Sequence, residues 1–214
     1  MIQHLSGRSL KKLKDNDFTY PFRSIKIRPM NEHHLILGTL TDFLTGKTIH
    51  DTLDERYRQN IARILVEEKG YQPSEIVKDY PLTVGATQKK AVLKIDFIVC
   101  VDGDNLMLIK YGPGSIVTRH RPALAASRLV GQTQIPCVVV TNGEESDILD
   151  GHSGNLLGRG LSSIPRRDDL ARLALTAVRD TICGKRIELE SRILYAFDVD
   201  GSCPCDTDIC RIES

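Results

Sequence analysis

The sequence predicts an α/β fold in which helices pack against a central sheet, with further helices toward the C-terminus. Runs of alternating, β-branched residues are typical of strands, and they recur at residues 76–84, 94–101 and 136–140. Between and after these runs, apolar residues recur at helical spacing, most clearly over residues 53–65 and 170–178. A chain of 214 residues is long enough to bury a core between such layers.

The first expected elements precede the sheet. Residues 1–50 are expected to form a polar, basic arm and a short β extension around Gly38. A helix is expected to begin after Thr52, because Thr52 and Glu55 have the spacing of a capping box, and to stop at Gly70. Its apolar face consists of Leu53, Tyr57, Ile61, Ile64 and Leu65.

A hairpin is expected over residues 94–112, with residues 102–104 as its loop. Counting back from that loop sets Asp96 opposite Lys110, on the same face of the sheet as Gly112. A carboxylate with a cation opposite it is a salt bridge and a poor magnesium site. The pattern therefore predicts an ion pair between Asp96 and Lys110.

The remaining elements complete the sheet and extend beyond it. A glycine-containing loop at 112–115, a basic helix over about 122–130 and a buried strand at 136–140 are expected in turn. Residues 153–214 are expected to form a C-terminal helical part, with helices over about 165–182 and 185–197 and an irregular tail that contains cysteines.

Composition limits the functional classes. The 41% hydrophobic and 27% charged residues are ordinary for a globular protein, and no apolar run reaches membrane-span length. The N-terminus lacks the apolar segment of a secretory signal, so a cytoplasmic location without a membrane partner is expected. The net charge is only +1, but residues 85–131 carry seven basic and three acidic side chains. This local excess indicates either a phosphate-bearing partner or simply a solvated face.

Several short motifs occur between residues 50 and 152 in one order and spacing. They are Thr52-Leu-Asp-Glu55-Arg-Tyr-Arg58-Gln59, Leu65-Val-Glu-Glu-Lys-Gly70-Tyr71, Ile95-Asp96 and Ile135-Pro-Cys-Val-Val-Val-Thr141-Asn142-Gly143. Together they resemble the N-terminal nuclease domain of type I restriction enzyme R subunits, in the form of small stand-alone bacterial proteins. The resemblance implies a restriction-endonuclease-like core over residues 51–152, with a mixed central sheet that helices flank.

The resemblance also implies a degenerate active site. In the active family, a helix glutamate, a strand aspartate and a Glu-x-Lys pair act together, and the carboxylates hold a hard divalent cation. Carried over by position, Glu55 matches the helix glutamate and Asp96 the strand aspartate. Lys110 stands at the second glutamate and Gly112 at the lysine. Glu55, Asp96 and Lys110 are therefore the vestigial catalytic positions.

Three functions remain open at this point. The leading one is a catalytically inactive module that binds nucleic acid or a protein partner through the face of the old site. The first alternative is an active magnesium-dependent DNA endonuclease, in which Lys110 acts from a displaced position and Glu55 supplies a second metal ligand. The second is a regulatory or scaffold protein with a metal site at C-terminal cysteines.

Two sets of residues are candidates for ligand binding. Contact with a nucleic-acid backbone is expected from residues in and around the glycine-containing loop, although tight turns explain its glycines equally well. These residues are Lys110, Ser115, Arg119, Arg121 and Arg128. A zinc ion or an iron–sulfur cluster is expected at four C-terminal cysteines, with unliganded reduced thiols as the alternative. These are Cys183, Cys203, Cys205 and Cys210.

Overall fold

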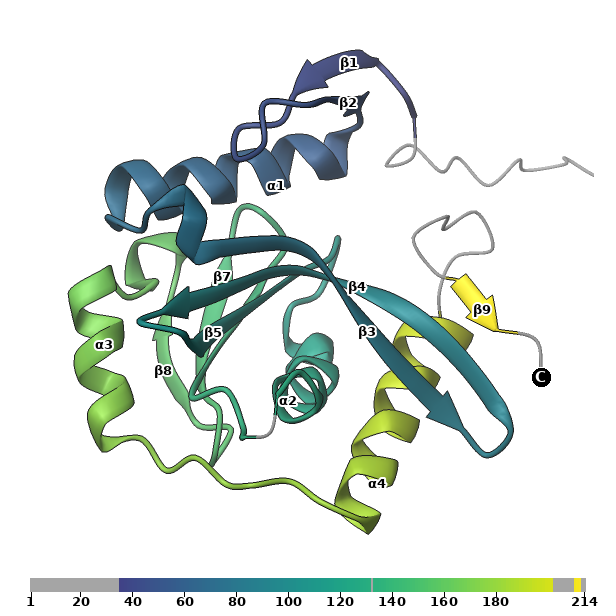
Figure 1. Cartoon of the computed structure of the whole chain (residues 1–214). Helices are drawn as coiled ribbons and strands as arrows, with labels where there is room; N and C mark the ends of the chain where they lie inside the picture. The colour runs from purple at the N-terminus through teal and green to yellow at the C-terminus, as the bar shows by residue number, and fades with distance from the viewer. Residues whose placement is uncertain (1–34, 132, 202–209, 213–214) are drawn as a thin grey trace, which may run out of the picture. The chain divides into compact units, whose positions relative to one another are not determined.

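A computed structural model of the chain describes residues 35–131, 133–201 and 210–212, all within one unit, Asn31–Ser214. Its centre is a twisted sheet with the strand order β3-β4-β5-β6-β7-β8 (Figure 1). Strands β5 and β6 are parallel and the other neighbours are antiparallel, so the mixed α/β sheet is confirmed. The strands are β3 (Ile76–Ala86), β4 (Lys89–Val101), β5 (Asp104–Tyr111), β6 (Cys137–Thr141), β7 (Ser146–Asp150) and β8 (Leu156–Arg159).

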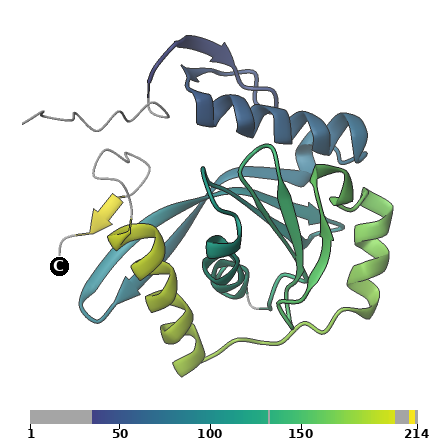
Figure 2. The same cartoon turned by 180° about the vertical axis from the view of Figure 1, so that it is seen from behind.

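Helices cover both faces of this sheet (Figures 1 and 2). One apolar core lies between the sheet and α1 and α3, and a second lies between the sheet and α2 and α4. None of the helices described is long and apolar enough to cross a membrane. The helices are α1 (Leu53–Arg63), α2 (His120–Leu129), α3 (Arg167–Thr176) and α4 (Lys185–Leu194), with π-helical turns η2 (Ile64–Glu68) after α1 and η6 (Tyr195–Asp200) after α4, and short 3-10 turns η3 (Pro73–Glu75), η4 (Val117–Arg119) and η5 (Leu161–Ser163).

A separate two-stranded ribbon precedes α1. Strands β1 (Gly38–Thr41) and β2 (Thr48–Asp51) pair antiparallel, in agreement with the expected β extension. Helix α1 begins directly after Thr52, whose hydroxyl accepts a hydrogen bond from the Glu55 amide at 3.1 Å. The short link fixes the ribbon next to the first turn of α1, where Glu55 lies.

The β3–β4 ribbon twists strongly near its middle. Phe97 and Val99 pack into the core beneath α1, whereas Ile95 and Leu93 pack into the core beneath α4. In an untwisted strand these four side chains would all lie on one face, because alternate residues share a face. The twist therefore turns this row of side chains from one core to the other between Ile95 and Phe97, at the position of Asp96.

In the same part of β4, the pairing partner on one edge changes. On one edge, β3 pairs with β4 along most of its length. On the other edge, β5 pairs with β4 only as far as Phe97, and β9 (Cys210–Ile212) pairs with residues 90–92. Among the described residues, neither β5 nor β9 pairs with residues 93–96, so the Asp96 side chain borders the fork where β4 changes its partner from β5 to β9.

The hairpin register at Asp96 agrees with the sequence, although the loop does not. The turn has two residues, so Val101 pairs with Asp104, and a bulge at Val99/Cys100 shifts the register by one. Phe97 then pairs with Ile109, which leaves Asp96 and Lys110 as the next two facing positions. The bulge compensates for the shorter turn.

Two expectations for residues after 150 were wrong. The helix expected to reach residue 182 ends at Thr176, because the following segment pairs with the chain before β6: the Gln134 amide donates to the Asp180 carbonyl, and Thr133 bridges Thr181. Strand β8 was not predicted, and it extends the central sheet beside β7. Its two leucines are partly exposed, so its sequence lacks the alternating apolar pattern of a buried strand.

Candidate functional site

Asp96 is buried at the fork in the sheet, and both of its carboxylate oxygens are occupied. Oδ1 accepts a hydrogen bond from Arg58 Nε at 2.7 Å, and Oδ2 accepts one from the Tyr111 amide at 2.8 Å. Asp96 is only 7% exposed. The carboxylate thus ties α1 to the end of β5, with a guanidinium at the place where a cation would otherwise bind.

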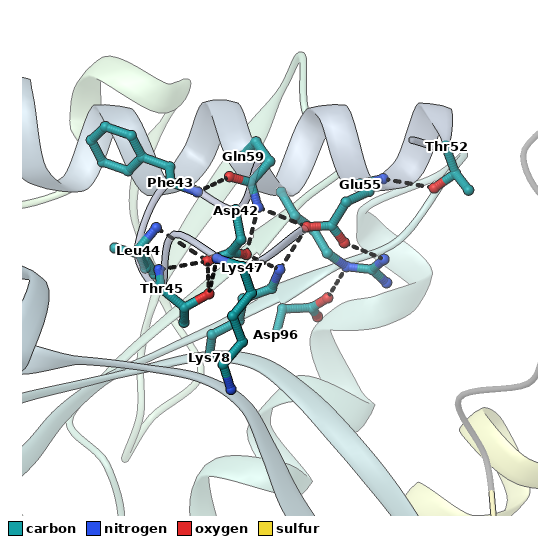
Figure 3. A network of polar contacts seen from close by, with 11 residues as sticks. Asp42, Phe43, Leu44, Thr45, Lys47, Thr52, Glu55, Gln59, Lys78 and Asp96 are labelled. Carbon is teal, nitrogen blue, oxygen red and sulfur yellow. Dashed lines mark hydrogen bonds and ion pairs between the residues drawn. The ribbon is translucent and has the colours of Figure 1, made fainter. Parts of the chain in front are cut away.

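Glu55 takes part in a polar network that joins α1, β3 and the β1–β2 ribbon, and Arg58 Nη1, at 3.8 Å from Glu55 Oε2, links this network to Asp96 (Figure 3). Lys78 Nζ lies 2.6 Å from Glu55 Oε1 and 2.6 Å from Asp42 Oδ2. Gln59 Nε2 donates to the same two carboxylates, at 2.8 Å in each case. The Glu55 carboxylate therefore binds a lysine and a glutamine of its own chain rather than completing the expected capping box.

Asp42 anchors this network from the turn between β1 and β2. Its Oδ1 accepts hydrogen bonds from the amide and the hydroxyl of Thr45, both at 2.8 Å, while Oδ2 faces Lys78 and Gln59. Burial alone would raise the pKa of Asp42, but the hydrogen bonds from Lys78, Thr45 and Gln59 outweigh it and hold the pKa well below its ordinary value. Asp42 is thus a fixed negative charge.

Lys78 is correspondingly held in its charged form. Burial disfavours the ammonium group, but hydrogen bonds to Asp42 and Glu55 outweigh burial and raise the pKa of Lys78. The network thus holds two cations, Lys78 and Arg58, among the carboxylates of Asp42, Glu55 and Asp96, so it carries one net negative charge.

The expected ion pair between Asp96 and Lys110 was wrong. Lys110 Nζ instead forms a short ion pair with Asp198 Oδ2, from the π-helical turn η6 that follows α4. Lys110 is only 7% exposed, so little water reaches this ion pair. Asp96 is instead paired with Arg58 from α1, and Lys110 is neutralised by a carboxylate from the C-terminal part.

The space beside Gly112 is filled by the Arg119 side chain. A Cβ atom built at Gly112 would lie 2.4 Å from the guanidinium carbon of Arg119. Arg119 Nη2 donates to the Pro113 carbonyl at 2.9 Å, which holds the guanidinium over the loop. A guanidinium therefore lies directly beside Gly112.

Aromatic residues form one wall of this region. The Tyr57 and Tyr111 rings stack with centroids 5.9 Å apart, and the Arg58 guanidinium lies 5.2 Å from the centroid of the Tyr111 ring. The Tyr111 hydroxyl donates to Asp54 at 2.8 Å. Burial, together with the Asp54 carboxylate, raises the pKa of Tyr111, so this phenol stays protonated.

The residues expected to contact nucleic acid lie in different environments. Ser115 is exposed on the loop and Arg119 is partly exposed. Lys110 is buried against Asp198, and Arg128 is buried against Glu190 with Nη1 at 3.2 Å from Oε1. Arg121 is 41% exposed and also contacts Glu190, at 2.6 Å. Of the four cations in this set, only Arg119 is both accessible to solvent and outside the ion pairs of the described residues, and it lies beside the exposed Ser115 loop.

The cysteine metal site stays a prediction. Cys183 is exposed just before α4, Cys210 begins β9, and Cys203 and Cys205 lie outside the described residues. Across residues 35–131 and 133–201, no group of three or more His, Cys, Asp or Glu side chains is arranged to hold a metal ion. Glu55 and Asp96 do not form such a group, because each faces a cation of the chain.

Sequence reasoning missed four residues that shape this region: Asp42, Arg58, Lys78 and Asp198. Asp42 had a detectable signal, because an aspartate three residues before a threonine is typical of a side-chain-capped turn. Lys78 and Asp198 carried no local signal, since their partners lie more than twenty residues away in the sequence.

Comparison with known proteins assigns the sequence around this site to a family. Residues 53–165, just over half of the chain, match the family model described as type I restriction enzyme R protein N terminus. No curated protein matches the chain, and no solved structure does. The matched residues include α1, the β4–β5 hairpin and the loop that carries Arg119.

Proposed function

Because the chain belongs to the family of type I restriction enzyme R protein N-terminal regions, we propose that it is a nuclease-like module that binds nucleic acid without cleaving it. One observation carries this proposal. Both carboxylates at the family's catalytic positions already bind cations of the chain: Asp96 binds Arg58, and Glu55 binds Lys78.

These contacts oppose metal binding. A hard divalent cation needs several oxygen ligands at once, and it gains little from carboxylates whose charge is already compensated. A guanidinium remains protonated in proteins, so Arg58 cannot release Asp96 by losing a proton. The other two catalytic positions hold Lys110, which is bound to Asp198, and Gly112, which has no side chain. Nothing at these positions replaces the charge stabilisation that a metal ion provides.

The positive charge at the site is retained, which supports binding. Arg119 brings a guanidinium over Gly112, where an active relative would have a lysine. In the described part of the chain its polar contact is a carbonyl, not a carboxylate, so its charge is available to a phosphate. Ser115 is exposed on the same loop and offers a hydroxyl. The loop and Arg119 therefore form the proposed phosphate-binding surface.

A protein partner is the second candidate. Three large apolar side chains on α4 and η6 are about half exposed: Ile187, Leu189 and Phe197. Exposed apolar side chains can contact a protein partner, although Ile187 and Leu189 lie two positions apart on α4 and so do not share one face. A protein partner becomes the preferred explanation if the wild-type protein does not bind DNA in the experiment below.

The first experiment measures cleavage and binding together. Single-stranded, double-stranded and supercoiled DNA would be incubated with magnesium or manganese and either the wild-type protein or Asp96→Ala. Binding of labelled DNA would be followed by fluorescence anisotropy over a range of salt concentrations. We expect no cleavage, and a salt-sensitive affinity whose slope falls by about one for Arg119→Ala. Arg172→Ala, which removes an exposed arginine on α3, is the matched control.

Two results would overturn the proposal. Metal-dependent cleavage that disappears in Asp96→Ala would mean that the site is active despite Arg58. Binding with the same salt dependence in wild type and Arg119→Ala would show that Arg119 does not contact the nucleic-acid backbone, and an absence of DNA binding by the wild type would remove nucleic acid as the partner.

Restoring the lost residues tests the same idea in the opposite direction. The pair Lys110→Glu and Gly112→Lys recreates the family's residues, but a side chain at position 112 collides with Arg119. The restoration therefore needs Arg119→Ala as well. Because Arg58 still occupies Asp96, we expect cleavage to require a fourth change, Arg58→Ala. Cleavage by the triple variant alone would show that Arg58 does not block the metal.

A further inference from the structure

A second polar site lies on the other side of the sheet, between α2, α4 and the segment that follows α3. It is a hollow of about 470 Å³, within the size range of small-molecule pockets. Apart from Ile182 its lining is polar, and none of it belongs to the catalytic positions or to the loop at 112–115. The polar lining consists of Arg128, Gln134, His152, Asp180, Thr181 and Arg186.

The α2–α4 wall of this hollow carries surplus positive charge. Glu190 is fully buried, and three arginines surround its carboxylate. Arg121 and Arg186 each approach it to 2.6 Å, and Arg128 approaches it to 3.2 Å. One carboxylate therefore faces three guanidinium groups, and two of these groups line the hollow.

The two lining arginines have donors left over. Arg186 uses Nε for Glu190 and Arg128 uses Nη1, and the described residues offer neither guanidinium a second carboxylate. Each guanidinium carries five N–H donors in a planar fork. Their remaining donors are therefore available to a ligand in the hollow.

Burial makes this surplus costly in the absence of a ligand. The Arg128 side chain is 9% exposed, and Arg121 Nη1 is buried without a hydrogen-bond partner among the described residues. Burial lowers the pKa of Arg128, the nearby Arg186 and Arg121 lower it further, and Glu190 opposes the change. An anion in the hollow would relieve both the repulsion and the desolvation.

The opposite wall contributes little net charge. His152 Nδ1 lies 2.9 Å from Asp180 Oδ2, so the one acidic residue of the lining has a partner. The Gln134 side-chain amide donates to the Gly151 carbonyl, which fixes its orientation. Thr181 adds a hydroxyl near the extended segment that replaces the end of α3.

We propose that this hollow binds a phosphate monoester, with Arg186 and Arg128 as its anion ligands. Planar guanidinium forks match phosphate oxygens in pairs, which a lysine cannot do. The hollow exceeds the volume of the phosphate itself, so the ligand carries a further group. The phosphate belongs either to a free small molecule or to the 5′ end of a nucleic-acid strand. This site is separate from the proposed function, because it shares no residue with the Arg119 surface.

The test is isothermal titration calorimetry of the full chain with inorganic phosphate and pyrophosphate, at ionic strength matched with chloride. We expect Arg186→Gln to weaken pyrophosphate binding roughly 10- to 100-fold, the loss expected for charged hydrogen bonds. Arg186 is 54% exposed, so this variant should keep the fold, as thermal unfolding would verify. Arg192→Gln, an exposed arginine of the same helix outside the hollow, should bind as the wild type does.

A second titration distinguishes the two sources of phosphate. A 5′-phosphorylated trinucleotide would be compared with its unphosphorylated form and with a mononucleotide. Preference for the phosphorylated trinucleotide over the mononucleotide identifies a strand end, and the reverse identifies a small molecule. The proposal is overturned if neither phosphate nor pyrophosphate binds the wild type, or if Arg186→Gln and Arg192→Gln bind equally well.

Discussion

Replacing Lys78 by methionine should destabilise the protein strongly, because Lys78 Nζ bridges the carboxylates of Asp42 and Glu55. Removing one partner of a buried ion pair costs about 3–5 kcal/mol. Asp42 keeps its hydrogen bonds from Thr45 and Gln59, so we expect a loss of about 3 kcal/mol, at the low end of that range. For a domain of this size, the melting temperature should fall by about 6–12 °C.

The dependence of this loss on pH provides a second check. The pKa of Asp42 is lowered in the folded state, so its contribution is present above the ordinary carboxylate pKa and is lost as the pH falls through the folded value. Lys78→Met removes one cause of that lowering. The difference in unfolding free energy between variant and wild type should therefore be largest near neutral pH and shrink in acid.

Urea unfolding at about pH 7 and at about pH 2.5, which lies between the ordinary carboxylate pKa and the lowered pKa of Asp42, would measure both effects. Lys47→Met, at an exposed lysine in the β1–β2 turn, is the matched control and should change stability by less than about 0.5 kcal/mol. A loss below about 1 kcal/mol for Lys78→Met would put it in the class of surface pairs and refute the reasoning. So would a loss that is equal at both pH values.

Three further predictions concern other contacts. Gly112→Ala should push the Arg119 guanidinium away at little cost in stability, and it should lower the salt slope of DNA binding as Arg119→Ala does; an unchanged slope in anisotropy would contradict this. Gly143→Ala should cost at least about 2 kcal/mol in urea unfolding, because its Cβ would enter a tyrosine ring at a positive φ, while Gly114→Ala, with a positive φ but open space, should cost only about 1 kcal/mol. Glu190→Gln should cost about 3–5 kcal/mol, since it leaves three guanidinium groups without their carboxylate, and a near-neutral result would show that water compensates them.

The sequence predicted the elements well where local pattern decides them. The spacing of apolar residues located α1 and β4, and both elements are present, although Leu53 is 44% exposed and β4 is buried on both faces over residues 95–99. The facing of Asp96 and Lys110 was also obtained, through a turn that is shorter than expected and a bulge that offsets it. The end of α3 could not be predicted from its local sequence, because it depends on a distant contact: residues 180–181 pair with residues 133–134 instead of continuing the helix.

Ion pairing in the candidate site was beyond the sequence for a physical reason. Which cation neutralises a buried carboxylate depends on distances set by the whole fold, and a charged residue carries no periodic signal. Arg58 and Asp198 therefore displaced the expected pairing of Asp96 with Lys110. Glu190 was detectable in principle, because it follows Arg186 and precedes Leu194 by one helical turn each, on the buried side of α4.

The pairing of β9 with β4 also bears on how the protein emerges from the ribosome. Residues 90–92 of β4 leave the ribosome well before β9, about 120 residues later. At ordinary rates of synthesis that edge waits roughly 6–24 s without its partner. An unpaired edge is a template for aggregation, and lysines are a common safeguard. Lys90 lies within this stretch of β4 and Lys89 and Lys94 flank it, so the waiting edge carries this safeguard in its own sequence.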